Sequence, residues 1–205
     1  HVAKLPSLFG LQADAWQTVQ SRLADARTQL TAAGYVPDQL TLNAGGSPTY
    51  QRHAAGTRAN EVAIGSAFVQ PSHFDDTVSG HVPACFIATP VLKVVEPVQI
   101  PGIEWLSAVS RQWDRNAERG YFIHGGQWLA DPVSPAGLER SSLYGVSSNQ
   151  ELWMGSKATG LTVDDRVFFR PTQSEAVLLQ FGDVQLYDSQ RSHIEAAWPV
   201  FPVSA

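Results

Sequence analysis

Thr41-Leu-Asn-Ala-Gly-Gly-Ser-Pro-Thr49 is the stretch on which the interpretation of the chain depends, because a short apolar run ends there in two glycines and a serine. Glycine allows a ligand to approach the backbone closely, and free N–H groups beside a hydroxyl bind anions. Turns of the same composition also occur without any ligand. The stretch alone leaves two interpretations open, a tight turn and a phosphate cradle.

A second strand-like run ends in the same way. Residues 61–67 read Glu-Val-Ala-Ile-Gly-Ser-Ala and follow the first run after a polar connection. In a (β/α)8 barrel, phosphate is frequently held by the loops after the last two strands. Two successive strand ends that carry Gly-Ser therefore favour the phosphate cradle. The predicted binding residues are Gly45, Gly46, Ser47, Gly65 and Ser66.

The first 80 residues carry alternating helix and strand signals. Apolar residues recur at spacings of three and four over residues 13–33, which predicts an amphipathic helix. Gly34 follows, and glycine commonly ends a helix in a left-handed conformation. Strands are predicted at 40–44 and 61–65. Helix, strand, loop and strand joined by short links are typical of an α/β domain.

After Pro71 the pattern changes to runs rich in Val, Ile, Phe and Leu, separated by Gly, Pro and Asp. These runs lack helical periodicity, so we predict that the second half is all-β. The boundary is expected between about 70 and 82, which gives domains 1–80 and 81–205. The strand-rich runs are 84–95, 120–130, 161–169 and 176–187.

Composition excludes several classes of protein. The net charge of −5 provides no basic face for a nucleic acid. No apolar stretch approaches the roughly 20 residues needed to cross a bilayer. The single cysteine, Cys85, excludes a disulfide framework and a Cys-rich zinc site. We therefore expect a soluble cytoplasmic protein that binds neither nucleic acid nor membrane.

Six stretches, in order, resemble the C-terminal portion of fold-type III pyridoxal-phosphate enzymes. The similarity is greatest to the D-serine dehydratase-like group, which includes D-threonine aldolases and amino-acid aldolases or racemases. The stretches are TLNAGGSPT (41–49), EVAIGSAFVQPSHFD (61–75), ACFIATPVLKVV (84–95), YFIHGGQWLADPVSPAGL (121–138), SSLYGVSSNQE (141–151) and VFFRPTQSEAVLLQFGD (167–183).

The resemblance implies an alanine-racemase-like (β/α)8 barrel that holds pyridoxal 5′-phosphate, followed by a β-domain, in a head-to-tail homodimer. Residues 1–80 would then be the C-terminal part of the barrel and 81–205 the D-serine dehydratase-like β-domain. Gly45, Gly46 and Ser47 match the family's Gly-Gly-Thr phosphate turn. Gly65 and Ser66 match the next strand end.

The family's Schiff-base lysine lies ahead of all the matching stretches. Lys4, Lys93 and Lys157 are the lysines of this chain, and none lies in a matching motif. His1 also stands where an initiator Met would be expected. We therefore expect a C-terminal portion of a longer enzyme, whose missing N-terminal barrel segment supplies the lysine.

The family's metal motif in the β-domain, Pro-x-His-x-Cys or Pro-x-His-x-Asp, corresponds here to Pro171-Thr-Gln173-Ser-Glu175. On a strand, the i, i+2 spacing would point Gln173 and Glu175 to one face. Glutamine is a poor zinc ligand, so we expect no tight zinc. Glu175 could bind a hard cation such as Mg²⁺ weakly or act as a general acid/base. The alternative is a pair of polar side chains on a solvated strand face.

The best single histidine is His124, which ends a β run before two glycines and could face a cavity; a structural role is the alternative. With Gln173 and Glu175 it completes the set of candidate catalytic residues. Cys85 is expected inside a strand as a small buried group. Four other histidines are predicted as loop or surface residues: His53, His73, His81 and His193.

These features predict a pyridoxal-phosphate-dependent lyase of aldolase type that acts on D-threonine or a related D- or β-hydroxy-amino acid. The cofactor would stabilise a carbanion, whose fate decides the reaction. An amino-acid racemase and a D-serine dehydratase are alternatives within the family. A non-catalytic protein that binds pyridoxal phosphate or acts as a scaffold is the alternative from another class.

Overall fold

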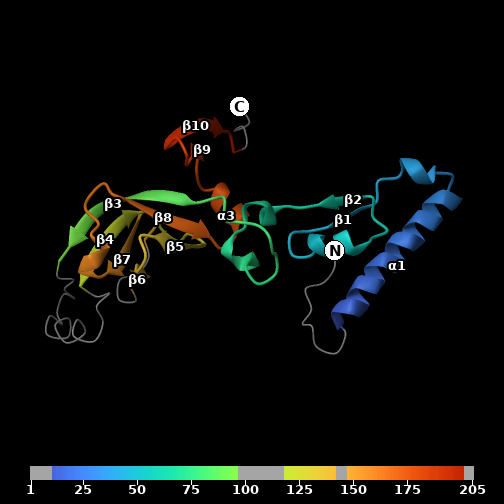
Figure 1. Ribbon diagram of the computed structural model, residues 1–205, viewed down its shortest axis with the longest axis horizontal. Helices are drawn as coiled ribbons and strands as arrows, with labels where there is room; N and C mark the ends of the chain where they lie inside the picture. The colour runs from blue at the N-terminus through green and yellow to red at the C-terminus, as the bar shows by residue number, and fades with distance from the viewer. Residues whose placement is uncertain (1–10, 97–117, 142–146, 201–205) are drawn as a thin grey trace. The chain divides into compact units, whose positions relative to one another are not determined.

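The computed structural model describes residues 11–96, 118–141 and 147–200, and for residues 11–14 the backbone alone. The chain divides into two compact units, His1–Ala84 and Cys85–Ala205 (Figure 1). The division falls four residues after the predicted end of the first domain at residue 80.

The helix predicted from periodicity is confirmed as α1 (Leu11–Ala32). It ends in a Schellman motif: Gly34 has φ +94°, and the N–H of Tyr35 donates to the carbonyl of Leu30 at 3.0 Å. In the described part of the chain, no helix is both long enough and apolar enough to cross a membrane. The predicted amphipathic pattern is visible in the exposure of α1, because Trp16, Val19, Leu23 and Leu30 are half-buried, and Gln20 beside them is buried.

Two short parallel strands follow, β1 (Asn43–Gly45) and β2 (Glu61–Ala63), with Ala44 opposite Val62. Both are shorter than predicted: β2 lies within its predicted region of 61–65, and β1 ends one residue beyond its predicted region of 40–44. A small core of Ala67, Phe74 and Val78 supports them, with Tyr50 packed against it. The remaining elements of this unit are the 3-10 helices η2 (Pro37–Gln39), η3 (Tyr50–Ala55), η4 (Ser66–Val69) and η5 (Ser72–Phe74).

The second unit contains a six-stranded antiparallel sheet in the order β5-β8-β3-β4-β7-β6, which confirms the predicted all-β character. The strands are β3 (Ile87–Val95), β4 (Arg119–His124), β5 (Ala130–Ser134), β6 (Glu139–Arg140), β7 (Gln150–Gly155) and β8 (Arg166–Pro171). A short 3-10 helix, η7 (Lys157–Thr159), precedes β8. The helix α3 (Ser174–Leu178) and a hairpin of β9 (Val184–Asp188) with β10 (His193–Trp198) follow.

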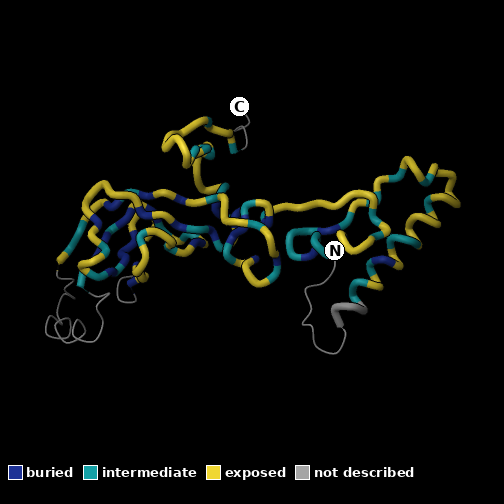
Figure 2. The backbone as a smooth tube through the Cα atoms, in the orientation of Figure 1, coloured by how far each residue is buried: buried dark blue, intermediate teal, exposed yellow. Residues whose placement is uncertain are grey.

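Alternation along the strands builds the core of the sheet, because every second side chain points to the same face. Ile87 and Val91 on β3, and Val167 and Phe169 on β8, are buried in this way. Phe169 is 1% exposed, and the ring of Trp153 meets it edge-on with centroids 5.0 Å apart. Full burial of such a side chain contributes about 1.5–3 kcal/mol. Figure 2 shows the buried backbone concentrated in these strands.

The prediction of a strand over 176–187 is wrong in its first part. The chain leaves β8 at Pro171 and turns into α3, and β9 begins only at Val184. Val177 of α3 is buried in the core of the sheet, so the apolar residues that suggested a strand fill that core from a helical turn instead.

Candidate functional site

Parallel pairing brings the two predicted turns together. Gly45 at the end of β1 lies opposite Ala63 at the end of β2, and the N–H of Gly46 donates to the carbonyl of Ala63 at 3.0 Å. Because parallel strands end at the same edge, both turns leave from that edge. The Oγ of Ser47 accepts the N–H of Ala67 at 3.1 Å and lies 3.4 Å from the Oγ of Ser66. We name residues 45–47 and 65–67 the cradle.

The glycines of the cradle have different physical roles. Gly45 has φ +102°, and a Cβ there would lie 2.8 Å from Val62 Cγ1 and 2.9 Å from the carbonyl oxygen of Ala63. Close approach of the strands therefore requires glycine at this position. A Cβ on Gly65 would meet the Oγ of Ser47 at an ordinary 3.5 Å. Crowding does not require glycine at this position. The absence of a side chain leaves the backbone of this turn accessible.

Hydrogen-bond donors remain available on the cradle. The N–H groups of Gly46 and Ala67 are used internally, whereas those of Ser47, Gly65 and Ser66 have no acceptor among the described residues. The side chains of both serines are half-buried. Three amides and two hydroxyls on adjacent turns can donate to one oxyanion.

The residues that follow the first turn of the cradle make further hydrogen bonds, some of them to the carbonyl of Gly46. The N–H groups of Thr49 and Tyr50 donate to the carbonyl of Gly46 at 2.9 and 3.0 Å. The Oη of Tyr50 is hydrogen-bonded to Nε2 of His81. The side chain of Gln51 brackets Ser79, donating to its carbonyl at 2.6 Å and accepting its N–H at 3.1 Å. Sequence analysis missed these pairs, because their partners lie about 30 residues apart and no motif links them.

The prediction that four histidines lie in loops or at the surface holds for three of them, because His81 lies in the loop that precedes β3. His73 and His193 are exposed. His81 is half-buried as the partner of Tyr50. His53 is 6% exposed and packs edge-on against Trp16 with ring centroids 4.8 Å apart, so the expectation of a surface residue is wrong there.

The strand geometry predicted for Gln173 and Glu175 is wrong. Pro171 ends β8, Gln173 precedes α3 in an extended conformation, and Glu175 lies in the first turn of that helix. The i, i+2 rule for strands therefore does not apply. Both side chains are exposed, and the buried residue of this segment is Ser174 between them.

His124 lies at the end of β4 with an exposed side chain, and its carbonyl accepts the hydroxyl of Thr89. The two glycines that follow are explained by packing. A Cβ on Gly125 would lie 2.3 Å from the ring of Trp128, and a Cβ on Gly126 would lie 1.8 Å from the carbonyl oxygen of Ser147.

The loop after His124 is fastened by a buried carboxylate that sequence analysis missed. Glu151 on β7 is 4% exposed and accepts the N–H of Gln127 at 2.7 Å and Nε1 of Trp153 at 3.2 Å. Arg140 forms an ion pair with it at 3.5 Å and stacks over Trp153 at 5.2 Å. This carboxylate is satisfied by structural partners.

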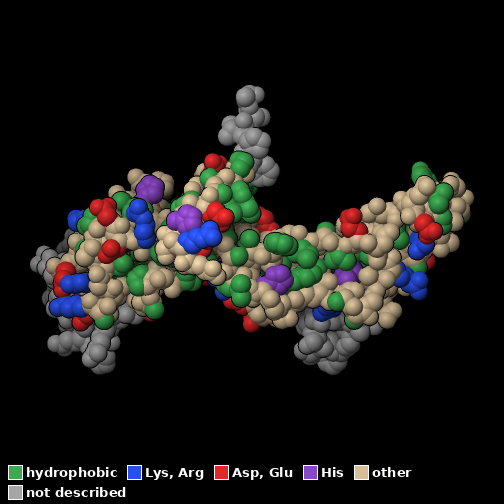
Figure 3. All heavy atoms as spheres, turned by 45° about the horizontal axis from the view of Figure 1, so that its top comes forward, with side chains coloured by type: hydrophobic (Ala, Val, Ile, Leu, Met, Phe, Trp, Pro, Cys, Tyr) green, Lys and Arg blue, Asp and Glu red, His purple; other side chains and the backbone are tan. Residues whose placement is uncertain are grey.

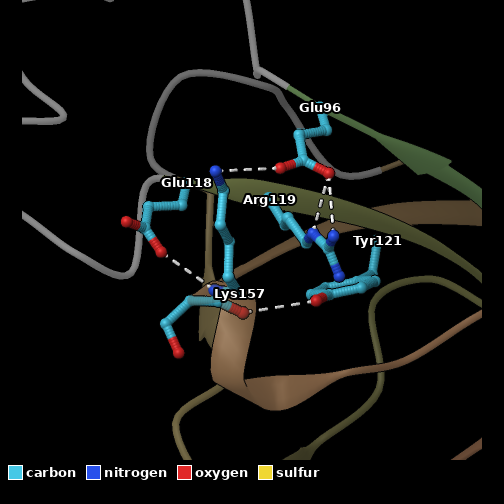
Figure 4. Close-up of polar contacts among 6 residues, drawn as sticks. Glu96, Glu118, Arg119, Tyr121 and Lys157 are labelled. Atoms are coloured by element: carbon cyan, nitrogen blue, oxygen red, sulfur yellow. Dashed lines mark hydrogen bonds and ion pairs between the residues drawn. The ribbon is translucent and has the colours of Figure 1, made fainter.

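The lysines in the described residues have contacts in the second unit. Nζ of Lys93 lies 5.9 Å from the ring centre of Phe122. Nζ of Lys157 lies 3.3 Å from Glu96, which also pairs with Arg119 at 2.9 Å (Figure 4). Lys4 and His1 lie outside the described residues.

The remaining predictions concern the cysteine and metal ligands. Cys85 is half-buried and precedes β3 rather than lying inside it, and burial raises the pKa of its thiol.

Within residues 11–96, 118–141 and 147–200, no group of three His, Cys, Asp or Glu side chains could hold a metal ion. On the face shown in Figure 3, Lys and Arg side chains are interspersed with Asp and Glu.

Comparison with known proteins identifies a fold. No family model matches the sequence, and no curated protein matches it. Among solved structures, the chain is similar to the crystal structure of D-threonine aldolase from Filomicrobium marinum, with a TM-score of 0.65 and 10% identity. The match covers 92% of this chain and 48% of that one, so the chain spans about half the length of this structure. At this identity the likeness shows a shared fold.

Proposed function

We propose that the chain is part of a pyridoxal-phosphate-dependent lyase of aldolase type, acting on D-threonine or a related D- or β-hydroxy-amino acid. One observation carries the proposal. The hydroxyl of Ser47 joins two Gly-Ser turns, and three backbone N–H groups on these adjacent turns remain available as donors. The fold shared with a D-threonine aldolase directs this general anion site towards one class of enzyme.

The cradle residues fit the phosphate of this cofactor. The N–H groups of Ser47, Gly65 and Ser66 would donate to its oxygens, together with the two serine hydroxyls. When bound, pyridoxal phosphate supplies an electron sink for a carbanion beside the substrate amino group. The cradle would fix one end of the cofactor and so orient its ring. The lysine needed for catalysis would come from a segment not represented among the matching stretches.

The two-stranded sheet supports the assignment of the first unit to a larger barrel. Parallel sheets are normally buried on both faces and rarely consist of two strands. All three residues of β2 are nevertheless exposed, including Val62, and Ile64 beyond the strand is exposed as well. Further parallel strands beside β1 and β2 would satisfy their edges and cover these side chains. We propose that these strands belong to the barrel's N-terminal segment, in a homodimer.

Glu175 and His124 are the acid–base groups that we propose for the β-domain. Both side chains are exposed and can therefore meet a substrate. Gln173, next to α3, would contribute a hydrogen bond, because an amide donates and accepts without changing charge. Glu175 could also bind a hard divalent cation weakly, since one carboxylate is too few ligands for a tight site.

Cofactor binding can be tested on the chain as it is. We expect pyridoxal 5′-phosphate to bind more tightly than pyridoxal, which lacks the phosphate, and inorganic phosphate to compete. Fluorescence or calorimetric titration measures both effects. Ser47→Ala should weaken phosphate-dependent binding, whereas Ser148→Ala at an exposed position should not. Equal binding of pyridoxal and its phosphate would refute the cradle.

The reaction can be tested on a longer form of the protein that carries the lysine. Aldol cleavage of D-threonine releases acetaldehyde and glycine, dehydration releases a 2-oxo acid and ammonia, and racemisation changes only the stereochemistry at Cα. Product analysis therefore separates the aldolase from the racemase and the dehydratase. Cofactor binding without turnover of any D-amino acid would favour the non-catalytic alternative.

A further inference from the structure

A buried polar cluster connects α1 to the segment between the two turns of the cradle. It consists of Gln20, His53 and Thr57, with the backbone of Arg58 and the ring of Trp16. Gln20 and His53 are 9% and 6% exposed. Oε1 of Gln20 accepts the N–H of Arg58 at 2.8 Å, and Nδ1 of His53 lies 3.0 Å from the hydroxyl of Thr57.

The hydrogen bonds of Thr57 determine which nitrogen of His53 carries the proton. A hydroxyl has one proton, and Thr57 donates it to Oε1 of Gln20 at 3.4 Å, because a carbonyl oxygen can only accept. The hydroxyl also accepts the N–H of Ala59 at 3.1 Å. Its contact with His53 then requires Nδ1 of the imidazole to donate. Neutral His53 therefore carries its proton on Nδ1, and Nε2 is an acceptor.

Two buried atoms of this cluster have no partner in the described structure: Nε2 of His53, an acceptor in this tautomer, and Nε2 of Gln20, a donor. A buried polar atom without a hydrogen bond is unfavourable. A proton on Nε2 of His53 would be worse, because it adds a charge and a second buried donor for which no acceptor is provided. The cluster thus accepts neutral His53 and opposes its protonated form.

We propose that this cluster is a pH-dependent latch, in which neutral His53 holds α1 on the segment between the two turns of the cradle and protonation of His53 releases it. The cluster contributes to the attachment of α1, since Gln20 is buried and hydrogen-bonded to Arg58 and Trp16 packs against His53. The imidazolium has no acceptor for Nε2–H in the cluster, so protonation favours loss of the contacts with Trp16 and Thr57.

The surrounding charges do not compensate for a proton on His53. The ionisable residues next to His53 along its own segment are Arg52 and Arg58, both cations. Burial, the larger cause, and the positive charge of the amino terminus lower the pKa of His53. The described α1 side chains one turn from the contacts are non-ionisable: Val19, Leu23 and Ala24.

The sign of the effect follows from this depressed pKa. The unfolded or released state binds a proton at higher pH than the latched state does, so the latch is fully closed above the ordinary imidazole pKa of about 6.5 and weakens below it. For each unit by which the latched pKa is depressed, the ratio of latched to released α1 falls about tenfold across the titration.

Nuclear magnetic resonance of the full chain tests the proposal. We expect the ring nitrogens of His53 to show the Nδ1–H tautomer and a pKa below the ordinary imidazole value. Amide protection factors along α1 should fall with the midpoint of His53, while those of β4 and β7 remain constant. An Nε2–H tautomer would overturn the latch. So would α1 protection that does not change as the pH falls from 7 through the midpoint of His53.

A variant separates titration of His53 from general acid effects. His53→Phe keeps a ring beside Trp16 but cannot be protonated, so α1 protection should become independent of pH in this range. His73→Phe is the matched control and should retain the pH dependence. If His53→Phe does not fold, the tautomer and the matching midpoints in the wild-type chain decide the question alone. pH dependence that persists in a folded His53→Phe chain would also refute the latch.

Discussion

The hydroxyl of Ser47 connects the two turns of the cradle. It accepts a backbone N–H from one turn and contacts the hydroxyl of Ser66 on the same turn. These contacts give it a structural role, because it holds the available amides on adjacent turns, and the proposed function adds a chemical one. The other residues of the cradle depend on this arrangement.

Removal of that hydroxyl tests both roles. Ser47→Ala leaves the N–H of Ala67, a fully buried residue, without its acceptor, which costs about 1–3 kcal/mol of unfolding free energy. Ser148→Ala should change stability by less than about 0.5 kcal/mol, as is usual for exposed positions. Denaturant unfolding of the two variants measures the difference. Equal midpoints would contradict a structural role of the hydroxyl.

Gly45 allows a prediction that does not depend on any ligand. Gly45→Ala forces a Cβ against Val62 and Ala63 at a positive φ, so we expect destabilisation of at least about 1–3 kcal/mol. Gly182→Ala is the matched control, since its Cβ would meet nothing within 4 Å and its φ is not positive. Thermal unfolding of both variants makes the comparison. A stable Gly45→Ala chain would show that β1 and β2 can separate without cost.

Individual elements were predictable where the signal is local. Periodicity identified α1, and runs rich in Val, Ile, Phe and Leu identified β3 and most of β4 and β8. The strands β5, β6 and β7 lie outside the predicted runs, except for Ala130. The helix α3 was not predicted, because its apolar residues pack into a core formed by residues distant in the sequence. A helix of five residues is also too short to show periodicity. The two turns of the cradle were predictable from composition. The pairs that support them, Tyr50 with His81 and Gln51 with Ser79, depend on tertiary contacts.

An ion-pair network joins Glu96, directly after β3, to Arg119 at the start of β4. The sign of its effect on stability as the pH changes can be predicted. Glu96 pairs with Arg119 and Lys157, and Glu118 accepts the N–H of Lys157 at 2.9 Å (Figure 4). The hydrogen bond from Arg119 is the largest cause that lowers the pKa of Glu96, followed among the lowering causes by that from Lys157. A carboxylate with a depressed pKa stabilises the fold above its unfolded value and loses this contribution as the pH falls.

We therefore predict that Glu96→Gln flattens the acid limb of the stability curve. The wild-type chain should lose more stability than the variant as the pH falls below about 4.3, the ordinary value for glutamate. Added salt should reduce the difference at neutral pH, because the groups are partly exposed. Urea midpoints between pH 3 and 7 test this, with Glu195→Gln as an exposed control. Parallel curves for the wild-type chain and Glu96→Gln would refute it.

At the scale of the whole molecule, the two units have very different cores. Among the described residues, the hydrophobic core of the second unit has eleven buried members, whereas that of the first has three. Apolar burial is the main stabilising contribution to folding, and a two-stranded sheet adds little by itself. The second unit therefore has the properties of an independent domain, and the first those of a part that needs further strands.

Separate fragments test this difference. We predict that residues 85–205 fold alone, with a cooperative thermal transition and dispersed amide resonances, because their core is internal to the fragment. Residues 1–84 should show helical signal without a cooperative transition, since α1 can form locally but β1 and β2 cannot bury their faces. A cooperative transition in 1–84 alone would contradict the proposed barrel segment, because the first unit would then be complete without additional strands.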